Sequence, residues 1–382
     1  MKPDHHHPHP SRRSFLGQAL AAPLSAALLD QAFIRAAKAR AATQVASQPT
    51  LFTLTKVAPG AYSAIAKPKT IINCNAVIFE NAKYLLIVDA HSKPSAAAAL
   101  VAQVRREITP KPIRYIVNTH FHWDHSEGDP AYRRLAPGAE IITSDTTREL
   151  LSQFGAARAR IEVEGAEASI PDLLHRLESA KTPEEKQRIR RSIAEIHAFA
   201  AEMHNYQPEL PDLTFDSSLT LHDKEHELQL TFRGRGHTGG DVVVFCPQNK
   251  ILATGDLLHG WFPFIGDGYP RDWPKTLATL KELPFATIVG GHGQAQQGDK
   301  RLTNFSNYIA ELTEAVASQK SVGRSVTEIQ SAVTAPSLHS LDDEYQSFLV
   351  SQLSDGQQTP AELIASNVKS NIADIFRRLD QS

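Results

Sequence analysis

Short apolar runs rich in β-branched residues recur along the chain between polar turns, and this pattern is typical of strands in an α/β protein. In the first half the runs predict four strands, at residues 51–57, 61–66, 71–80 and 84–89. In the second half they predict four more, at residues 217–221, 227–233, 241–246 and 250–254. We therefore expect two halves that face each other, the first of which begins with antiparallel pairing.

Segments with a helical period separate these strands in the first half. Residues 94–108 are expected to form a helix that leads into an apolar strand at 112–119. Residues 139–143 and 146–154 are expected to form a further strand and helix. Strands that alternate with helices in this way indicate βα units after the initial meander.

Two longer helical segments lie outside this pattern. Residues 169–206 are charged and periodic, and they predict an inserted helical hairpin that turns at Thr182-Pro183, with Thr182 as the N-cap of its second helix. The insertion either supports the domain or covers a cleft as a lid. Residues 301–382 also show a helical pattern, in which Thr359-Pro360-Ala361-Glu362 marks the start of the last helix. This extension is expected to pack on the domain or to offer a partner surface.

A dense cluster of metal-binding side chains directly follows the predicted strand at 112–119. It places three imidazoles and a carboxylate in six residues, His120-Phe121-His122-Trp123-Asp124-His125. Imidazole nitrogen and carboxylate oxygen together favour zinc, whereas calcium and magnesium sites consist almost entirely of oxygen. On an extended backbone, side chains two residues apart point to the same side of the chain, so His120 and His122 can converge on one ion. Asp124 and His125 are then better placed for a second ion.

Three further metal-binding residues follow later strand ends, each beside glycines that permit tight turns. They are His237 in the run 234–241, Asp256 after the strand at 250–254, and His292 in the run 288–293. H-x-H-x-D-H after a strand, followed by these three residues in this order, resembles the metallo-β-lactamase superfamily over roughly residues 51–294.

The resemblance implies an α/β fold of the αββα sandwich type and a site for two Zn²⁺ ions, with iron and manganese as open alternatives. It assigns His120, His122 and His237 to one metal, Asp124, His125 and His292 to the other, and Asp256 to a bridge between them. Asp124 is also the expected catalytic residue, because it would align a metal-bridging hydroxide. The implied activity is hydrolysis of an ester, thioester, lactone or lactam bond in a small substrate.

The identity of the residue at the bridging position indicates which branch of the superfamily the chain resembles. Some lactamases have cysteine where this chain has Asp256, so the pattern is more similar to glyoxalase II and the broad hydrolase branch. The chain shows no set of basic residues like the glutathione-binding tail of glyoxalase II. A β-lactamase proper, an iron-dependent persulfide dioxygenase-like oxidoreductase and a non-catalytic binding protein therefore remain as alternatives.

Residues around the expected ligands have assigned roles as well. Asp89 ends an apolar strand where the family also has an aspartate, and it is expected to orient a ligand rather than to bind metal itself. His91 is expected on the surface. Aromatic residues near the ligands are expected to form an apolar wall for substrate, namely Trp123, Trp261, Phe262, Phe264 and Tyr269.

The N-terminus contains a second motif. The run 11–17 resembles a twin-arginine export signal built on Arg12 and Arg13, and the short apolar stretch after it precedes A-x-A sequences at 37–39 and 39–41. The expected organisation is a signal peptide at 1–42, a metallo-β-lactamase-like domain at 48–300 and a helical extension at 301–382. The resemblance implies a periplasmic or secreted protein that meets the twin-arginine translocase during export.

The amino-acid composition indicates which kinds of partner the chain is expected to have. The 382 residues are 41% hydrophobic and 21% charged with a formal net charge of −2, which is typical of a globular protein and unlike the basic footprint of a nucleic-acid binder. No apolar run reaches the roughly 18 residues of a permanent membrane anchor. The expected partner is therefore a small-molecule substrate. The two cysteines, Cys74 and Cys246, could form a disulfide after export or remain buried thiols.

Overall fold

The computed structural model describes residues 50–67, 74–353 and 358–380, all within one unit of the chain. The twin-arginine motif, its cleavage sites and the beginning of the strand expected at 71–80 lie outside these residues. None of the helices in the described ranges combines the length and apolar character that crossing a bilayer requires.

The first half of the fold is a seven-stranded sheet whose strands lie in the order of the sequence. The first four strands pair antiparallel, and the last four, from β4 onward, pair in parallel. Its strands are β1 (Phe52–Ala58), β2 (Ala61–Ala66), β3 (Ala76–Glu80), β4 (Leu85–Val88), β5 (Ile113–Val117), β6 (Glu140–Ser144) and β7 (Leu213–Phe215). Parallel neighbours need a crossover, and the helix α2 (Pro94–Glu107) supplies the one between β4 and β5.

The second half is a six-stranded sheet in which only β11 and β12 pair in parallel. Its strands are β8 (Ser218–Leu221), β9 (Leu228–Phe232), β10 (Val242–Cys246), β11 (Ile251–Gly255), β12 (Thr287–Gly290) and β13 (Gln296–Gln297). The helix α8 (Trp273–Leu280) lies in the crossover between β11 and β12.

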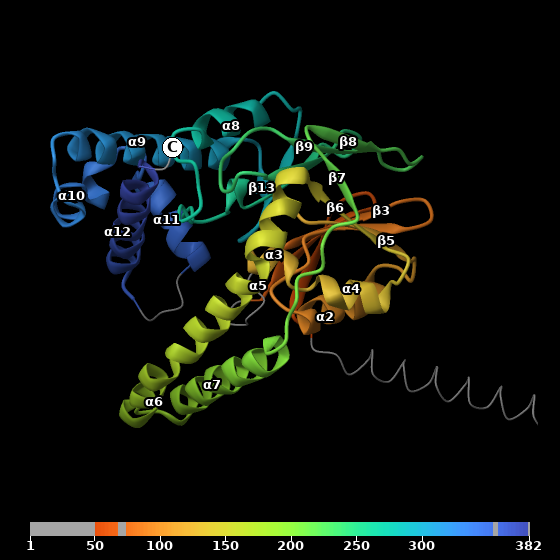
Figure 1. The fold of residues 1–382 in the computed structure, drawn as a ribbon, viewed down its shortest axis with the longest axis horizontal. Helices are drawn as coiled ribbons and strands as arrows, with labels where there is room; N and C mark the ends of the chain where they lie inside the picture. Colours follow the sequence, from red (N-terminus) through yellow and green to blue (C-terminus); the bar gives the residue numbers. More distant parts are fainter. Residues whose placement is uncertain (1–49, 68–73, 354–357, 381–382) are drawn as a thin grey trace, which may run out of the picture. The chain divides into compact units, whose positions relative to one another are not determined.

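The two sheets face each other between layers of helices, as the αββα expectation required (Figure 1). Strand β10 shows why its sequence is apolar throughout. Val242 and Val244 belong to the core between the sheets, whereas Val243 and Phe245 face the helices α8 and α9 (Lys300–Ser321). Successive side chains point to opposite faces, so a strand covered on both faces needs no polar positions. On the outer face of the first sheet, α2 and α4 (Asp129–Leu135) complete the sandwich.

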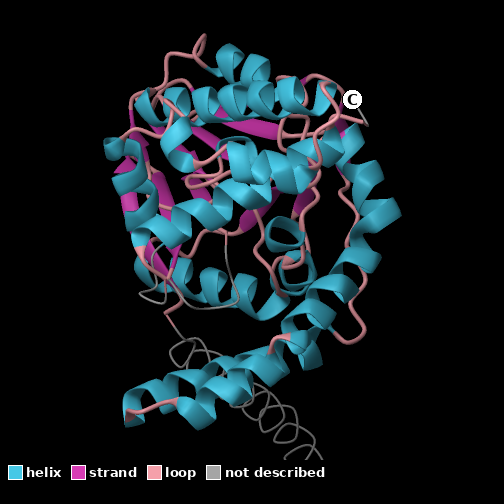
Figure 2. Cartoon of the chain, turned by 90° about the vertical axis from the view of Figure 1, so that its left-hand side faces the viewer, coloured by secondary structure: helices cyan, strands magenta, loops and turns pink. Residues whose placement is uncertain are grey.

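The insertion begins earlier than expected. The helix expected at 146–154 is the first part of α5 (Asp145–Ala168), which Ser144 caps by accepting a hydrogen bond from the Thr147 N–H. The expected hairpin follows as α6 (Ile170–Ser179) and α7 (Pro183–Met203), and Thr182 caps α7 as expected. Helix α6 has no buried residue, and this arm extends away from the sheets (Figures 1 and 2).

The C-terminal helices pack against α8 and α9. They are α10 (Val326–Ala332), α11 (Asp343–Leu353) and α12 (Pro360–Arg378), and Thr359 and Glu362 form the expected capping box of α12. Ile364, Val368 and Ile372 of α12 are buried in the same cluster as residues of α8 and α9. Cys74 and Cys246 are both buried free thiols, so no disulfide joins them.

Candidate metal centre

The seven expected ligands converge at one edge of the sandwich. His120 follows β5, His237 follows β9, Asp256 follows β11 and His292 follows β12, so the ends of four strands deliver them. All seven are buried, with at most 5% of any of them exposed. Side chains that are far apart in sequence therefore share one buried site.

The change of backbone conformation at His122 explains how one short motif serves two positions. His122 is extended, at φ −69° and ψ 152°, and the short helix α3 (Trp123–Ser126) begins directly after it. Ser126 Oγ donates a hydrogen bond to the His122 carbonyl at 3.0 Å and closes this turn. His120 thus lies in the bend after β5 and His122 on extended backbone, while Asp124 and His125 turn away on the helix.

Two glycines permit the close approach of the strand ends. Gly255 has φ +50°, and a Cβ there would lie 2.1 Å from Thr119 Oγ1. A Cβ on Gly291 would lie 1.9 Å from Asp256 Oδ1. Any larger residue at either position would push Asp256 away from the histidines.

The ligand atoms form the two sets that the family resemblance implies. Nitrogen atoms of His120, His122 and His237 all lie within 4.8 Å of one another, and so do ligand atoms of the second set, which consists of Asp124, His125 and His292. Within the first set, His122 Nδ1 and His237 Nε2 are 2.8 Å apart.

Asp256 lies between the two sets. Its Oδ2 is 3.5 Å from His237 Nε2, and its Oδ1 is 3.3 Å from the Nε2 atoms of both His125 and His292. One carboxylate thus faces both groups with different oxygens, which is the geometry that a bridging ligand requires.

The polar atoms at the centre fit a divalent metal. His120 Nε2, His125 Nε2 and Asp256 Oδ1 are buried and make no hydrogen bond among the described residues. A buried polar atom without a partner costs about 1–3 kcal/mol, and three of them meet here. A cation would satisfy all three. Imidazole and carboxylate donors suit zinc and other transition metals.

The protonation of the first set also fits metal binding. Burial, followed by the charges of His125, His237 and His122, holds the pKa of His120 well below its usual value. Burial and His122 likewise lower the pKa of His237. Both rings are therefore neutral at physiological pH, and neutral imidazole is the form that ligates metals.

Asp89 makes the contacts expected of a residue that orients a ligand. Its Oδ2 lies 2.8 Å from His125 Nδ1, and its Oδ1 accepts a hydrogen bond from the Thr119 N–H at 2.8 Å. The remaining nitrogen of His125 is thereby turned toward Asp256 and the second set of ligands.

The expectation for His91 was wrong. His91 is fully buried, its ring packs at 4.6 Å from that of Phe52, and its Nδ1 lies 3.3 Å from Cys74 Sγ. Asp89 and His91 both have positive φ, 67° and 70°. This turn directs the His91 side chain into the apolar layer beneath the first sheet.

Two charged residues that are not among the seven expected ligands fix the position of His122. Its Nε2 lies 2.9 Å from Asp267 Oδ2, and Arg158 of α5 forms an ion pair with the same carboxylate. Burial would raise the pKa of Asp267, but hydrogen bonding to His122 and the charges of His122 and Arg158 lower it instead. No local sequence pattern predicts that His122, Asp267 and Arg158 meet, because they come from the ligand motif, the loop after Asp256 and α5.

His259 is a third residue that the sequence analysis did not assign. Its Nε2 lies 3.0 Å from Asp256 Oδ2, and its ring stacks on His292 with centroids 4.4 Å apart. His259, Asp256 and His292 also bring ligand atoms within 4.8 Å of one another. The spacing of three residues after Asp256, across the short 3-10 turn Asp256–Leu258, was the available signal.

A cavity of about 330 Å³ opens onto this site. Three of the five aromatic residues singled out in the sequence line it, namely Trp123, Trp261 and Phe264. The other residues that line it are His122, Asp124, Asp256, His259, His292, Arg158 and Glu162.

Phe262 and Tyr269 do not line the cavity, contrary to expectation. Phe262 turns into the core, where it is 3% exposed and packs against Tyr308 with ring centroids 5.4 Å apart. The ring of Tyr269 contacts the guanidinium groups of Arg235 and Arg378, at 4.3 and 5.1 Å. The loop after Asp256 thus directs only some of its aromatic side chains toward the ligands.

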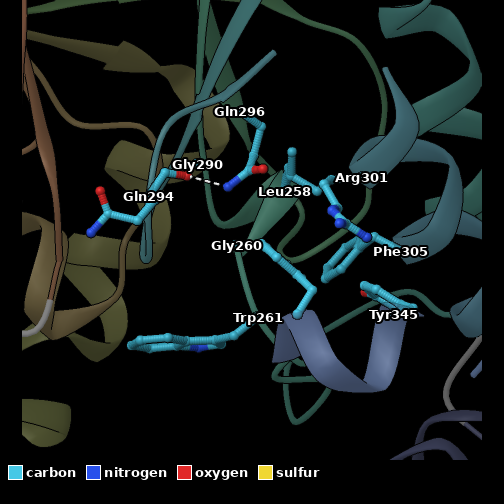
Figure 3. Close-up of a pocket in the computed structure, with 10 residues that line it drawn as sticks. Leu258, Gly260, Trp261, Gly290, Gln294, Gln296, Arg301, Phe305 and Tyr345 are labelled. Carbon is cyan, nitrogen blue, oxygen red and sulfur yellow. Dashed lines mark hydrogen bonds between the residues drawn. The ribbon is translucent and has the colours of Figure 1, made fainter. Parts of the chain in front are cut away.

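The C-terminal helices support the back of this loop. A second cavity of only about 10 Å³ is lined by Gly260 and Trp261 and by Arg301, Phe305 and Tyr345 of α9 and α11 (Figure 3). It is about large enough for one water molecule and too small for a substrate. The extension therefore packs against the loop that positions Trp261.

Comparisons with known proteins agree on one family. The family model described as the Metallo-beta-lactamase superfamily matches residues 70–292. A relative from Elizabethkingia meningoseptica, named Metallo-beta-lactamase type 2, is 31% identical over 85 residues, which are 21% of this chain and 34% of the relative. A protein of the same name from Bacteroides fragilis is 34% identical over 90 residues, 22% of this chain and 36% of the relative. The chain thus matches about a third of the length of these relatives.

Solved structures of similar proteins have low sequence identity. A metallo-beta-lactamase from Pontibacter korlensis is 19% identical, with a TM-score of 0.48 over 67% of this chain and 97% of that protein. A metallo-beta-lactamase from Hirschia baltica is also 19% identical, with a TM-score of 0.47 over 68% of this chain and 97% of that protein.

Proposed function

The chain belongs to the metallo-beta-lactamase superfamily, and we propose that it is a hydrolase that binds two zinc ions through its seven buried histidine and aspartate residues. The observation that carries this proposal is the pair of ligand sets on either side of Asp256, at the base of a cavity. The buried atoms of His120, His125 and Asp256 that make no hydrogen bond among the described residues support it, because a metal would satisfy them.

A pair of bound metal ions would lower the pKa of a shared water and polarise the carbonyl group of a substrate. The residues of the chain contribute the positioning. Asp124 belongs to the second ligand set, lines the cavity and lies 3.4 Å from His292 Nε2. Its carboxylate is therefore placed to accept a hydrogen bond from an attacking water, while Asp89 and Asp267 fix the rings of His125 and His122.

The cavity supports a small substrate. About 330 Å³ is near the lower end of the range for ligand pockets, about 300–1,000 Å³. Trp123, Trp261 and Phe264 give it an apolar wall that would exclude water from the reacting bond. We propose an ester, thioester, lactone or lactam as the reacting group. Asp256 in the bridging position favours the broad hydrolase branch with the glyoxalase II-like pattern.

A second candidate is hydrolysis of β-lactams, because the relatives found bear the name Metallo-beta-lactamase type 2. A chromogenic cephalosporin beside ester, thioester and lactone substrates distinguishes the two. Turnover of the cephalosporin alone would favour the lactamase.

The direct test combines metal analysis with hydrolysis. We expect two zinc ions per chain by mass spectrometry of protein recovered from its own compartment, together with turnover of at least one class of substrate. His237→Ala should remove metal and activity, whereas His175→Ala on exposed α6 should change neither. One iron per chain with oxygen uptake would overturn the proposal in favour of a persulfide dioxygenase-like oxidoreductase.

Export and domain organisation are part of the same proposal. We infer that residues 1–42 direct the chain through the twin-arginine translocase to the periplasm or beyond, and that residues 48–300 form the catalytic domain. Cell fractionation tests this: replacing Arg12 and Arg13 by Lys should retain the protein in the cytoplasm. Export of the double variant at the normal rate would contradict it.

A further inference from the structure

Two charged residues of α5 line the cavity without belonging to the expected ligand sets. They are Arg158 and Glu162, one helical turn apart. The charge of Arg158 is already compensated, because its guanidinium pairs with Asp267 and lies 4.9 Å from the centre of the Phe121 ring. Asp267 therefore offsets part of the positive charge that Arg158 brings to the cavity.

Glu162 has no direct contact of this kind. Among the described residues it forms neither a hydrogen bond nor an ion pair within 4.0 Å, although it is partly buried and faces the site. Burial and the charge of Asp124 raise the pKa of Glu162, and the charge of Arg158 one turn away opposes this only in part. A cation in the cavity would stabilise the ionised form further. Asp124 and Asp256 also line the cavity but belong to the expected ligand sets, so Glu162 is the carboxylate of the cavity wall that remains for a substrate.

The other wall residues also favour a cation. Trp123, Trp261 and Phe264 line the same cavity, and each is accessible to solvent, Phe264 to 45%. The faces of aromatic rings attract ammonium groups, and aromatic cages are a common means of binding quaternary ammonium ligands. A carboxylate and three aromatic rings around one small cavity thus form a complementary surface for a positive charge.

We propose that the substrate carries a protonated amino or quaternary ammonium group, which Glu162 binds while the aromatic side chains surround it. This inference rests on the proposed function and names the substrate class of the same site. The insertion then has a direct part in specificity, because α5 brings the recognising carboxylate to the cavity.

The test uses esters of one acyl group that differ only in charge. The panel consists of a choline ester, its uncharged isostere with 3,3-dimethylbutanol, and an ester of similar size that carries a carboxylate. For the zinc-loaded chain, we expect kcat/KM for the choline ester to exceed that for the isostere about tenfold, as a partly desolvated cation site allows.

Substitutions assign this preference to Glu162. Glu162→Gln should reduce the ratio to about one, and Glu162→Lys should shift the preference toward the carboxylate ester. Glu164→Gln is the matched control, because Glu164 is exposed on the same helix and does not line the cavity. A ratio near one for the unaltered chain, or an equal loss in Glu162→Gln and Glu164→Gln, would overturn the inference.

A binding measurement separates this inference from the proposed function. Calorimetry of benzyltrimethylammonium with the zinc-loaded chain should show binding that Glu162→Gln weakens about tenfold. If no ester, thioester, lactone or lactam is hydrolysed, the proposed function fails, yet this binding would still support the cation site. If hydrolysis occurs but the cation does not bind, the cation site is wrong and the hydrolase remains.

Discussion

Asp89 is a residue whose effect reaches the metal site through another side chain. Its carboxylate accepts a hydrogen bond from the Thr119 N–H and lies 2.8 Å from His125 Nδ1. Asp89 itself is not one of the seven expected metal ligands. Carboxylates that hold a ligating histidine fix both the tautomer and the direction of the ring. Asp89 therefore should influence metal affinity without altering the ligand set.

We predict that Asp89→Asn weakens zinc binding by about 10- to 100-fold, because the neutral amide no longer stabilises the His125 N–H. Competition with a chelating dye measures the affinity. Asp216→Asn is the control, since Asp216 is exposed and away from the site. Equal affinities in the two variants, with unchanged circular dichroism, would show that Asp89 has no such role.

Glu311 gives a prediction for pH. Its carboxylate on α9 accepts hydrogen bonds from the backbone N–H groups of His339 and Ser340, at 2.9 and 2.8 Å. Partial burial opposes ionisation, but the bonds from Ser340 and His339 outweigh it and lower the pKa of Glu311 to about 2. A carboxyl with a lowered pKa stabilises the fold above its unfolded pKa, and this contribution disappears as the pH falls toward the folded value.

Glu311→Gln should therefore lower the free energy of unfolding by about 1 kcal/mol at pH 7, where the carboxylate accepts both bonds. Below pH ~4 the difference from the unaltered chain should shrink, because the carboxyl of the unfolded chain becomes protonated there. The contribution should disappear only as the pH approaches the folded pKa of about 2. Urea unfolding at pH 7, 5 and 3 measures this. A difference that stays constant over this range would indicate that the charge is unimportant.

The sequence predicts single residues well where they are close together or follow a family order. The motif from His120 to His125 predicts two pairs of metal-binding residues, and the structure brings His237, Asp256 and His292 close to it. Asp267 and Arg158 could not be predicted, because each has an ordinary local context and meets His122 only through the fold. The position of His91 was predicted wrongly for the same reason. The positive φ angles of Asp89 and His91 turn this side chain inward, and no sequence pattern marks them.

At the scale of elements, apolar runs located most strands but not the extent of the insertion. The strands β9, β10 and β11 lie close to their expected positions, because alternating or continuous apolar residues define them. Helix α5 was cut short in the prediction, since its polar second half leaves the domain and buries few residues. Only the folded chain shows that this helix reaches the cavity through Arg158 and Glu162.

The contact between α5 and the loop after Asp256 leads to a third prediction. Asp267→Asn should lower zinc affinity about tenfold, because the carboxylate no longer fixes His122. Arg158→Gln should have a smaller effect, and the double variant should be no worse than Asp267→Asn alone, because both act through one carboxylate. The same dye competition measures all three.

The control for this cycle is Asp272→Asn, which breaks the exposed ion pair between Asp272 and Arg235 in the same region without touching a ligand. Additive effects of the Arg158 and Asp267 substitutions would mean that the insertion influences the metal site by another route.

At the scale of the molecule, the C-terminal helices pack closely on the rest of the fold. Residues of α9, α11 and α12 share one buried cluster with Trp273 of α8 and Leu258 after Asp256. The sequence predicted these helices from their caps and period, but their role depends on what they cover. Their contacts behind Trp261 connect the end of the chain to the wall of the cavity (Figure 3).

Metal removal tests the centre as a structural element of the whole domain. Without metal, two carboxylates and five imidazoles remain buried together, and His120 Nε2, His125 Nε2 and Asp256 Oδ1 make no hydrogen bond among the described residues. A ligand present at about a thousandfold excess over its Kd stabilises the folded state by about 4 kcal/mol. We predict that EDTA lowers the midpoint of thermal unfolding by about 10 °C, and that added zinc restores it. His237→Ala lacks one expected ligand of the first set. Its midpoint of thermal unfolding without EDTA should be lower than that of the unaltered chain, and EDTA should lower it less. Calorimetry that gives the same midpoint for the unaltered chain with and without EDTA would show that the seven side chains hold no metal that matters to the fold.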